Sequence, residues 1–505
     1  MTPHPDAADT IAAIATPPGR GALGLVRFSG SDAVSLARQL FRPWRAGGPF
    51  PVARQAVTGS ARVAAGPALP GDTSAAPERS PASLAGRHQA VASVAMEEID
   101  TGVLIYFPAA DSPTGEDLIE LTLHGSPVVL RRMLAAAVRF GARPAGPGEF
   151  SYRAFLHGRL DAVQAEAIDD LIQARTEQQA RVAHRQQRGA LSAAVEPIRR
   201  ALVDWLARIE GSLEFSATET EDFLDWHALS AGLAVQQAAL DRLVSDAARG
   251  LRLRSGARVV FSGPVNTGKS SIFNKLLGID RAIVSSIPGT TRDVVEADVD
   301  WDGLPITLVD TAGERAPAPG IARSAAVPGA ADSIEKEGQR RGASERLASD
   351  LVVWVNAVDE TTPLLPPEFP GGSRPLPVLN KIDLVPPAGG RATAMSVSPD
   401  TRTRLAVSAR TGEGMAPLRA AILDRLAPRQ EIGDLPLVTR LRQKERLEAA
   451  RRAVAEAAAA TQRRAGEEML AVPIGEALVC LAELTGRGGL DEMYERIFST
   501  FCIGK

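Results

Sequence analysis

Several short stretches of the sequence combine residue types that can bind phosphate, a divalent cation and a purine base. The first is Gly263-Pro-Val-Asn-Thr-Gly-Lys-Ser270, which matches the pattern G-x-x-x-x-G-K-S. In such a loop the backbone N–H groups surround phosphates, Lys269 reaches the β and γ oxygens, and the Ser270 hydroxyl binds magnesium. The strand-like run ARVVF precedes it and SSIFNKLLG, a candidate helix, follows. This context favours a phosphate-binding loop over an ordinary glycine-rich turn.

Two further motifs follow apolar runs that we expect to be strands. Asp310-Thr-Ala-Gly313 comes after PITLV, and its aspartate is predicted to hold magnesium through water. Asn380-Lys-Ile-Asp383 comes after LPVL. The Asp383 carboxylate can accept both N–H donors of the guanine edge, whereas adenine would present a lone pair there. Each motif alone is typical of a turn, but together and in this order they predict a GTP site.

Two other segments complete the predicted site. Ser408-Ala409 ends another strand and could place a backbone amide near the guanine carbonyl. Between the phosphate loop and Asp310 lies GTTRD, in which Thr291 is predicted as a second magnesium ligand, although a Thr-Thr pair is usually just part of a loop. No glutamine follows the Asp310 motif to orient water, since Glu314 and Arg315 come next. The catalytic group must therefore come from elsewhere.

The residues from about 255 to 426 alternate apolar strands with candidate helices. This order predicts right-handed crossovers and a mostly parallel sheet, with the nucleotide at the carboxyl ends of the strands. A Pro/Ala-rich stretch at about 314–331 interrupts the segment next to the Asp310 motif.

The first 160 residues or so are predicted to form an α+β domain. Strands are expected over GALGLVRFSG, TGVLIYFP and EDLIELTLHG, and a helix over 126–140, where Pro127 lies in the first turn. Residues 59–88 are small, polar and Pro-rich, and we interpret them as a mobile insertion outside the core.

Two stretches, 161–254 and about 439–501, have apolar residues at helical spacing with charged residues between them. The simplest architecture pairs them into one helical domain, with the α/β segment inserted between its halves. A chain of 505 residues agrees with about three domains.

Net charge, cysteine count and the distribution of apolar residues exclude several classes of protein. A net charge of −3 excludes a global positive field that recruits nucleic acid, so RNA binding would need a local patch or a partner. Two cysteines, Cys480 and Cys502, cannot form a disulfide framework. The N-terminus has no secretion signal pattern and no run is long enough to span a membrane, so we expect a cytoplasmic protein.

Motifs outside the nucleotide site carry a family resemblance. TPPGRG near the N-terminus, PGEFSYRAFL, LDAVQAEAIDDLI, the GTTRD segment and the terminal FCIGK are all present. With these the sequence resembles, over nearly its whole length, the MnmE (TrmE) family of tRNA modification GTPases. The resemblance implies a tetrahydrofolate-binding and dimerisation domain over 1–158, a helical domain over 159–254 and 429–505, and a G domain over 255–428.

The resemblance also implies a function. Members work as homodimers with the flavoprotein MnmG (GidA), in a heterotetramer whose FAD is expected on the partner only. Together they install a carboxymethylaminomethyl or aminomethyl-type group at C5 of the wobble uridine of certain tRNAs. A tetrahydrofolate in the 5,10-methylene or 5-formyl form supplies one carbon, and GTP hydrolysis with Mg²⁺ and K⁺ drives the cycle. Neither a membrane nor DNA is an expected partner.

The resemblance assigns functional residues at the positions where this sequence matches a motif of the family. The implied potassium ligands are Asn266, Ser285, Ile287 and Thr290, and the implied magnesium ligands are Ser270 and Thr291. Glu335, in DSIEKEG, is the candidate that orients water, with Glu337 close by, and Lys269 is the other catalytic candidate. The full set expected to bind GTP is Asn266, Thr267, Gly268, Lys269, Ser270, Ser271, Ser285, Ser286, Ile287, Pro288, Gly289, Thr290, Thr291, Asp310, Thr311, Ala312, Gly313, Asn380, Lys381, Asp383, Ser408, Ala409 and Arg410.

The implied folate site consists of Arg27, Glu120, Arg159 and Lys505. Arg159 stands where the family often has lysine, so a planar fork replaces a point charge. Arg27 and Glu120 could equally be ordinary strand-edge charges. Cys502 is either a reactive thiol near the folate or a small apolar residue packed beside its neighbours.

Two other functions stay open. A GTP-switched ribosome-assembly or stress factor would share the G domain but would not need the folate-like N-terminal half or FCIGK. An ATPase is disfavoured by Asp383.

Overall fold

The computed structural model of the chain describes residues 9–45, 50–64, 95–215, 224–278, 282–283, 295–311, 349–358, 375–385, 405–426, 438–487, 497–498, 501 and 503–504. The chain forms two compact units, Met1–Asp169 together with Ala482–Lys505, and Asp170–Leu481. Within the described residues, no helix is long and apolar enough to cross a lipid bilayer.

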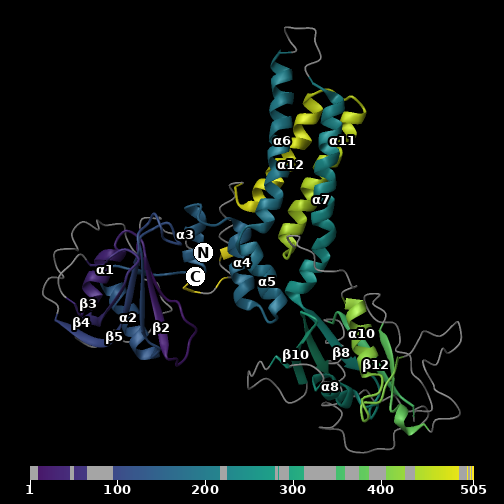
Figure 1. The fold of residues 1–505 in the computed structure, drawn as a ribbon, viewed down its shortest axis with the longest axis horizontal. Helices are drawn as coiled ribbons and strands as arrows, with labels where there is room; N and C mark the ends of the chain where they lie inside the picture. The colour runs from purple at the N-terminus through teal and green to yellow at the C-terminus, as the bar shows by residue number, and fades with distance from the viewer. Residues whose placement is uncertain are drawn as a thin grey trace, which may run out of the picture. The chain divides into compact units, whose positions relative to one another are not determined.

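A seven-stranded mixed sheet forms the centre of the first unit (Figure 1). Its order is β3-β4-β5-β6-β2-β1-β7, in which only the pair β1 and β7 is parallel. The three strands expected from the sequence are present as β2, β5 and β6. In chain order the strands are β1 (Ile11–Ile14), β2 (Leu23–Ser29), β3 (Phe41–Pro43), β4 (Ala56–Ala64), β5 (Met96–Phe107), β6 (Leu118–His124) and β7 (Arg143–Pro144).

Two helices, α1 (Ala33–Leu40) and α2 (Pro127–Arg139), pack on this sheet. Helix α2 confirms the helix predicted over 126–140, and its proline lies in the first turn, where the missing N–H breaks no hydrogen bond. Leu36 of α1 and Met133 of α2 join Phe28 of β2 in one buried apolar cluster. The first unit therefore has the α+β core that the sequence predicts.

Residues 59–64 belong to this sheet, so the prediction that the insertion begins at residue 59 is wrong. They form the second half of β4, where Val63 is buried in the apolar cluster. A Cβ atom on Gly59 would lie 2.6 Å from the ring of Phe41. The small residues that suggested a loop are thus what close packing requires. The rest of the predicted insertion lies outside the described residues.

The end of the chain packs on helix α3 (Glu149–Leu156) within the first unit. The rings of Phe498 and Tyr152 lie 5.3 Å apart in an edge-on arrangement. Ile503 forms an isolated antiparallel bridge with Pro147. The terminal segment is therefore part of the N-terminal fold.

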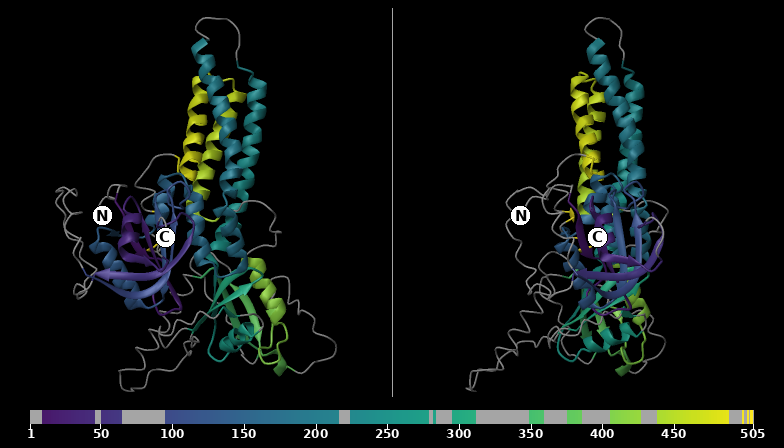
Figure 2. Two further views of the ribbon diagram at one scale, coloured as in Figure 1. Left: turned by 60° about the vertical axis from the view of Figure 1, so that its left-hand side comes forward. Right: turned by 90° about the vertical axis from the view of Figure 1, so that its left-hand side faces the viewer.

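Long helices dominate the second unit (Figures 1 and 2). Helix α7 of the first helical stretch packs against α11 of the second, and Asp241 of α7 pairs with Arg451 of α11 at 3.2 Å. Helices α6 and α12 run beside them in both figures. This confirms the predicted pairing of the two stretches. Helices α5 (Glu177–Gln187), α6 (Ala190–Phe215), α7 (Trp226–Ser255) and α11 (Leu441–Gln462) belong to this unit. Two helices continue from one unit into the other, α4 (Ala162–Gln173) after Asp169 and α12 (Glu468–Thr485) after Leu481.

A second seven-stranded sheet lies between α7 and α11 in the chain. Its order is β14-β13-β12-β8-β11-β10-β9, with the first five strands parallel and β10 and β9 antiparallel to their neighbours. The predicted mostly parallel sheet is confirmed. The strands are β8 (Ala257–Ser262), β9 (Ala282–Ile283), β10 (Val295–Trp301), β11 (Leu304–Asp310), β12 (Leu351–Ala357), β13 (Leu376–Asn380) and β14 (Leu405–Ala406).

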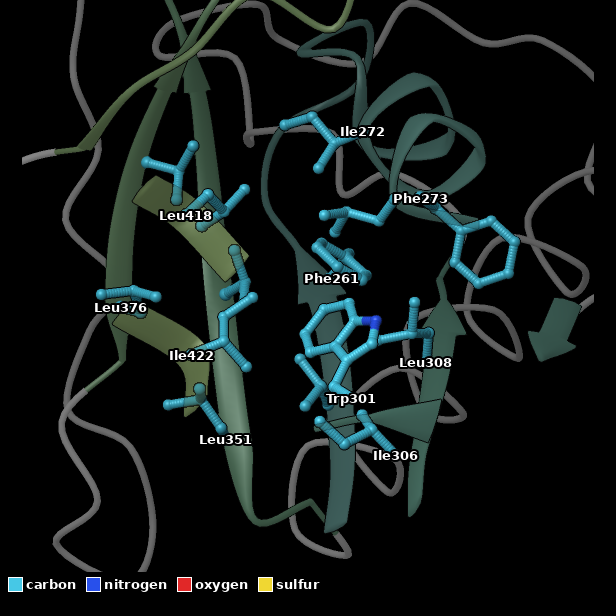
Figure 3. Close-up of a cluster of buried hydrophobic side chains, with 14 of the residues drawn as sticks. Phe261, Ile272, Phe273, Trp301, Ile306, Leu308, Leu351, Leu376, Leu418 and Ile422 are labelled. Carbon is cyan, nitrogen blue, oxygen red and sulfur yellow. The ribbon is translucent and has the colours of Figure 1, made fainter. Parts of the chain in front are cut away.

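Helices α8 (Lys269–Leu277) and α10 (Met415–Leu426) pack on this sheet through a shared apolar core (Figure 3). Phe261 of β8 and the fully buried Trp301 of β10 lie near its centre, and Ile272 comes from α8. The core holds the strands in register, so that the loops after β8, β11, β13 and β14 start from fixed positions.

Candidate nucleotide site

The loop between β8 and α8 has the backbone that phosphate binding requires. Gly263 has φ +141° and Gly268 has φ +88°. Side chains are excluded at both positions as well, because a Cβ atom would lie 2.2 Å from the Val355 carbonyl oxygen and 2.3 Å from Asn380 Nδ2, respectively. Glycine is therefore needed for conformation and for space at both ends of the loop.

Lys269 begins helix α8 and points back into this loop. Its Nζ donates to the carbonyl oxygens of Gly263 (3.0 Å) and Pro264 (2.7 Å). The same Pro264 oxygen accepts a hydrogen bond from Thr267 Oγ1 at 3.0 Å. The amine is thus held where a phosphate oxygen could replace a carbonyl as its acceptor.

The other predicted residues of this loop are accessible. Asn266 is exposed and has the left-handed φ of +64°. Ser270 and Ser271 are exposed in the first turn of α8. In this chain Pro264 and Val265 precede Asn266, and the loop still closes through the bond from Thr267 to the Pro264 carbonyl. The arrangement leaves donors and oxygen ligands on the solvent side.

Asp310 is the last residue of β11, at the carboxyl end of the sheet as predicted. Its Oδ1 is buried and has no hydrogen-bond partner among the residues that the structure describes. The neighbouring Thr311 is fixed, because its Oγ1 donates to the Phe261 carbonyl at 2.7 Å. The orphaned carboxylate oxygen of Asp310, on the strand next to the one that leads into the phosphate loop, suits Mg²⁺, which prefers oxygen ligands. The residues present therefore fit that ion.

Asn380 ties the phosphate loop to the predicted base-binding loop. Its side chain is buried, with Nδ2 donating to the Thr267 carbonyl (2.8 Å) and Oδ1 accepting from the Ala409 amide (3.1 Å). Lys381 follows with a φ of +65°. The sequence suggested that Ser408-Ala409 could place a backbone amide near the guanine carbonyl. In the structure the Ala409 amide donates to Asn380, so a contact with guanine would share or replace this bond.

Asp383 lies in the short 3-10 helix η2 (Ile382–Leu384) and is oriented by a neighbour that sequence reasoning missed. Ser408 Oγ donates to its Oδ1 at 2.7 Å. Arg410 is largely exposed, and its Nη1 lies 3.9 Å from the other carboxylate oxygen, Oδ2. The serine hydroxyl thus orients the carboxylate through Oδ1. The only sequence signal that Ser408 orients Asp383 is its place at the end of the last predicted strand.

Asn356 is a second residue that sequence reasoning missed. It lies near the end of β12, which pairs with β8 and β13, and is 2% exposed. Within the described part of the chain, its Oδ1 has no hydrogen-bond partner. A polar residue in the otherwise apolar run LVVWVNA was the available signal. Unpaired buried oxygens therefore occur on both strands that flank β8.

Part of the predicted site lies outside the described residues. This part contains the first switch segment, the glycine of the Asp310 motif, the candidate that orients water and the last folate residue. The residues are Ser285, Ser286, Ile287, Pro288, Gly289, Thr290, Thr291, Ala312, Gly313, Glu335 and Lys505, together with Glu337 and Cys502.

Three predicted folate residues are described. Arg27 of β2 and Glu120 of β6 are cross-strand partners, with Nη2 and Oε1 2.6 Å apart, and Arg27 Nη1 also donates to the Gly504 carbonyl at 3.3 Å. The pair therefore binds the end of the chain. Arg159 Nη2 donates to the carbonyl oxygens of Ala109 (2.8 Å) and Ala110 (2.6 Å).

The first unit also contains a buried network of charges. Arg153 and Glu149 of α3 are each 3% exposed; Arg153 binds Glu116 and Asp9, and Arg143 forms two bonds to Glu149. Burial raises the pKa of Glu149, but the hydrogen bonds from Arg143 and from a backbone amide outweigh burial. The pKa therefore lies below its ordinary value of 4.5. These charges are paired with one another, which is the mark of a structural network.

Two family models match the chain. The model of the GTP-binding protein TrmE N-terminus matches residues 10–159, and that of the MnmE helical domain matches residues 163–502. The G domain of the T. maritima FeoB iron transporter is 20% identical and covers 34% of this chain and 98% of that one, with a TM-score of 0.21. A TM-score this low carries no argument about the fold. The assignment of the fold therefore rests on the strand order described above.

Curated relatives match over almost their whole length. The tRNA modification GTPase MnmE of Nitrosococcus oceani is 36% identical over 501 residues, covering 98% of this chain and 97% of the relative. The protein of the same name from Thermus thermophilus is 37% identical over 500 residues, covering 98% and 99%. This chain therefore belongs to the family of the tRNA modification GTPase MnmE.

Proposed function

We propose that this chain is a potassium-stimulated GTPase that works with the flavoprotein MnmG (GidA) on tRNA. Together they would install a carboxymethylaminomethyl or aminomethyl-type group at C5 of the wobble uridine. One observation carries the nucleotide part of this proposal. Asn380 joins the phosphate loop to the loop in which Ser408 orients Asp383. A guanine-reading carboxylate is thereby coupled to a phosphate-binding loop.

At the nucleotide we assign roles by chemistry. Lys269 would contact the β and γ oxygens and neutralise charge that develops in the transition state. Ser270, Thr291 and, through water, Asp310 would hold Mg²⁺. Glu335 would orient the attacking water. Mg²⁺ held there would supply Lewis-acid stabilisation of the charge on the phosphate oxygens. The other residues predicted to bind GTP, between Asn266 and Arg410 in the sequence, would have the roles that the family resemblance implies.

We propose that K⁺ binds Asn266, Ser285, Ile287 and Thr290 and stands in for an arginine finger. Asn266 is exposed in the phosphate loop, where a side-chain oxygen is accessible to a cation. Replacing sodium with potassium is then expected to raise the hydrolysis rate. Equal rates in both salts would remove this role.

The domain assignment is part of the proposal. Residues 1–158 would bind a tetrahydrofolate and mediate a homodimer, 159–254 with 429–505 would form the helical domain, and 255–428 would form the G domain. The bond from Arg27 to the Gly504 carbonyl supports a folate site that includes Lys505, since it holds the end of the chain on β2. We further propose a cytoplasmic heterotetramer with MnmG.

Base selection is tested by Asp383→Asn. The substitution removes a charged acceptor of two N–H bonds, so GTP binding is expected to weaken by about 10- to 100-fold while binding of xanthosine triphosphate improves. The exposed Asp424→Asn, on α10, is the matched control. Unchanged preference for guanine would contradict the assignment.

The base chemistry is tested by mass spectrometry of tRNA nucleosides from cells that lack this protein. Loss of the wobble-uridine modification, restored by the unaltered gene but not by the Asp383→Asn gene, is the expected result. Intact modification would favour a GTP-switched ribosome-assembly or stress factor instead.

A further inference from the structure

Strands β10 and β11 form a hairpin that connects the nucleotide site to a distant turn. Their register is continuous, from Trp301 opposite Leu304 at the turn to Val295 opposite Asp310 at the other end. Seven paired residues at about 3.4 Å each place the turn roughly 20 Å from Asp310. Trp301, fully buried in the core, anchors the turn end (Figure 3). A displacement of this turn is therefore transmitted to Asp310.

The start of helix α5 holds the turn. Thr176 Oγ1 donates to the Gly303 carbonyl at 2.8 Å. Gly303 has φ +88°, and a Cβ atom there would lie 1.9 Å from Gln178 Oε1. Any side chain at this position would thus be strained and would clash with the helix. The turn and the start of the helix are therefore closely packed.

A charged contact secures the side of the hairpin. Arg175 Nη1 lies 3.2 Å from Asp298 Oδ2 on β10. The other oxygen of this carboxylate accepts a hydrogen bond from Thr307 Oγ1 on β11 at 2.6 Å. One carboxylate therefore joins the helix start to both strands.

The helix start is itself fixed. The Gln179 amide donates to Thr176 Oγ1, and Gln179 Nε2 donates to the carbonyls of Leu253 and Arg254, where the chain leaves α7 for β8. The Thr176 hydroxyl thus accepts from the helix and donates to the hairpin. The helical domain therefore fixes the position of the turn through this hydroxyl.

We infer that Arg175 and Thr176 are positioning residues for GTP hydrolysis. They hold the turn of the β10–β11 hairpin and so set the position of Asp310 at its other end. The inference rests on the proposed role of Asp310.

The full-length chain offers a matched pair of substitutions at one atom. Thr176→Ser keeps both the helix cap and the hydroxyl donor. Thr176→Asp keeps a good capping acceptor but cannot donate to the Gly303 carbonyl. Arg175→Gln removes the ion pair without touching the cap. Arg181→Gln, which breaks an exposed pair with Glu177 on the same helix, is the control.

GTP hydrolysis is measured with magnesium and potassium, together with the thermal unfolding midpoint. Loss of one hydrogen bond or ion pair predicts a fall in kcat of about 3- to 10-fold for Thr176→Asp and Arg175→Gln, with KM for GTP nearly unchanged. Thr176→Ser and Arg181→Gln should keep the original kcat. Hydrogen exchange should also show a GTP-analogue effect on residues 175–187 that Thr176→Asp abolishes.

Folded Thr176→Asp and Arg175→Gln proteins with the kcat of the unaltered chain would overturn the inference, since the contact would then be packing alone. If Thr176→Asp fails to fold, Arg175→Gln decides by itself. Asp310→Asn tests the metal site separately, so failure of the proposed site is distinguished from failure of the hairpin contact.

Discussion

The charge network around α3 and the carboxyl ends of β11 and β12 differ in how their buried polar groups are satisfied. Around α3, Glu149, Arg153 and their partners form ion pairs and hydrogen bonds with one another. At the carboxyl ends of β11 and β12, Asp310 Oδ1 and Asn356 Oδ1 are buried without a hydrogen-bond partner among the described residues. An unpaired buried oxygen costs free energy of folding, whereas a paired charge maintains a fold. We interpret the unpaired oxygens at this end of the sheet as groups that await a ligand.

The largest expected effect on stability is in the paired network. Glu149→Gln removes a buried carboxylate that accepts hydrogen bonds from Arg143 and Arg153, while both arginines keep Asp9 as a partner. The free energy of unfolding should fall by about 1.5–3 kcal/mol, as for the loss of a buried hydrogen bond to a charged group. Denaturant unfolding of the first unit, followed by its aromatic signal, measures the change. Glu177→Gln, which breaks the exposed helical pair with Arg181, is the control and should have little effect. Equal losses of unfolding free energy in both variants would contradict the view that the buried network contributes more to stability than an exposed pair does.

The phosphate loop should show the reverse pattern. Lys269→Ala is expected to lower kcat by about 10²- to 10³-fold because it removes charge stabilisation in the transition state, with a much smaller effect on unfolding. Lys275→Ala, on the same helix, is the matched control. Steady-state GTP hydrolysis and thermal unfolding, measured on one preparation, separate the two effects. A Lys269 variant with near-normal turnover would contradict the assigned role.

Acid should act on the first unit through Glu149. Because its pKa is lowered in the folded state, its contribution to stability is fully present above pH 4.5, the ordinary value, and is lost as the pH falls through the folded pKa. Unfolding of the first unit measured between about pH 6 and pH 3 should therefore show a falling free energy. In Glu149→Gln this slope should become smaller. An unchanged slope would assign the acid sensitivity to other carboxylates.

Local patterns predicted most of the fold and the backbone of the site. The glycine and lysine spacing of the phosphate loop, the Asp310 position and the proline that starts α2 all depend on neighbours in the chain, and the structure has them as expected. Residues 59–64 were misassigned because small side chains are common both in loops and in tightly packed strands.

Contacts between distant residues could not be predicted in the same way. The Ser408 bond to Asp383, the engaged Ala409 amide and the Thr176 bond to Gly303 join residues that only the tertiary fold brings together. Neither periodicity nor motif spacing encodes such pairs. The same holds for Arg143 and Asp9, which are 134 positions apart.

The most direct test of the comparison is Asp310→Asn, measured for magnesium-dependent GTP hydrolysis and for unfolding without ligand. We predict that hydrolysis loses most of its response to magnesium, while the free energy of unfolding stays the same or rises by about 1 kcal/mol because an unpaired buried charge is gone. Normal magnesium-dependent hydrolysis combined with a clear loss of stability would contradict the account, since Asp310 would then be a structural residue.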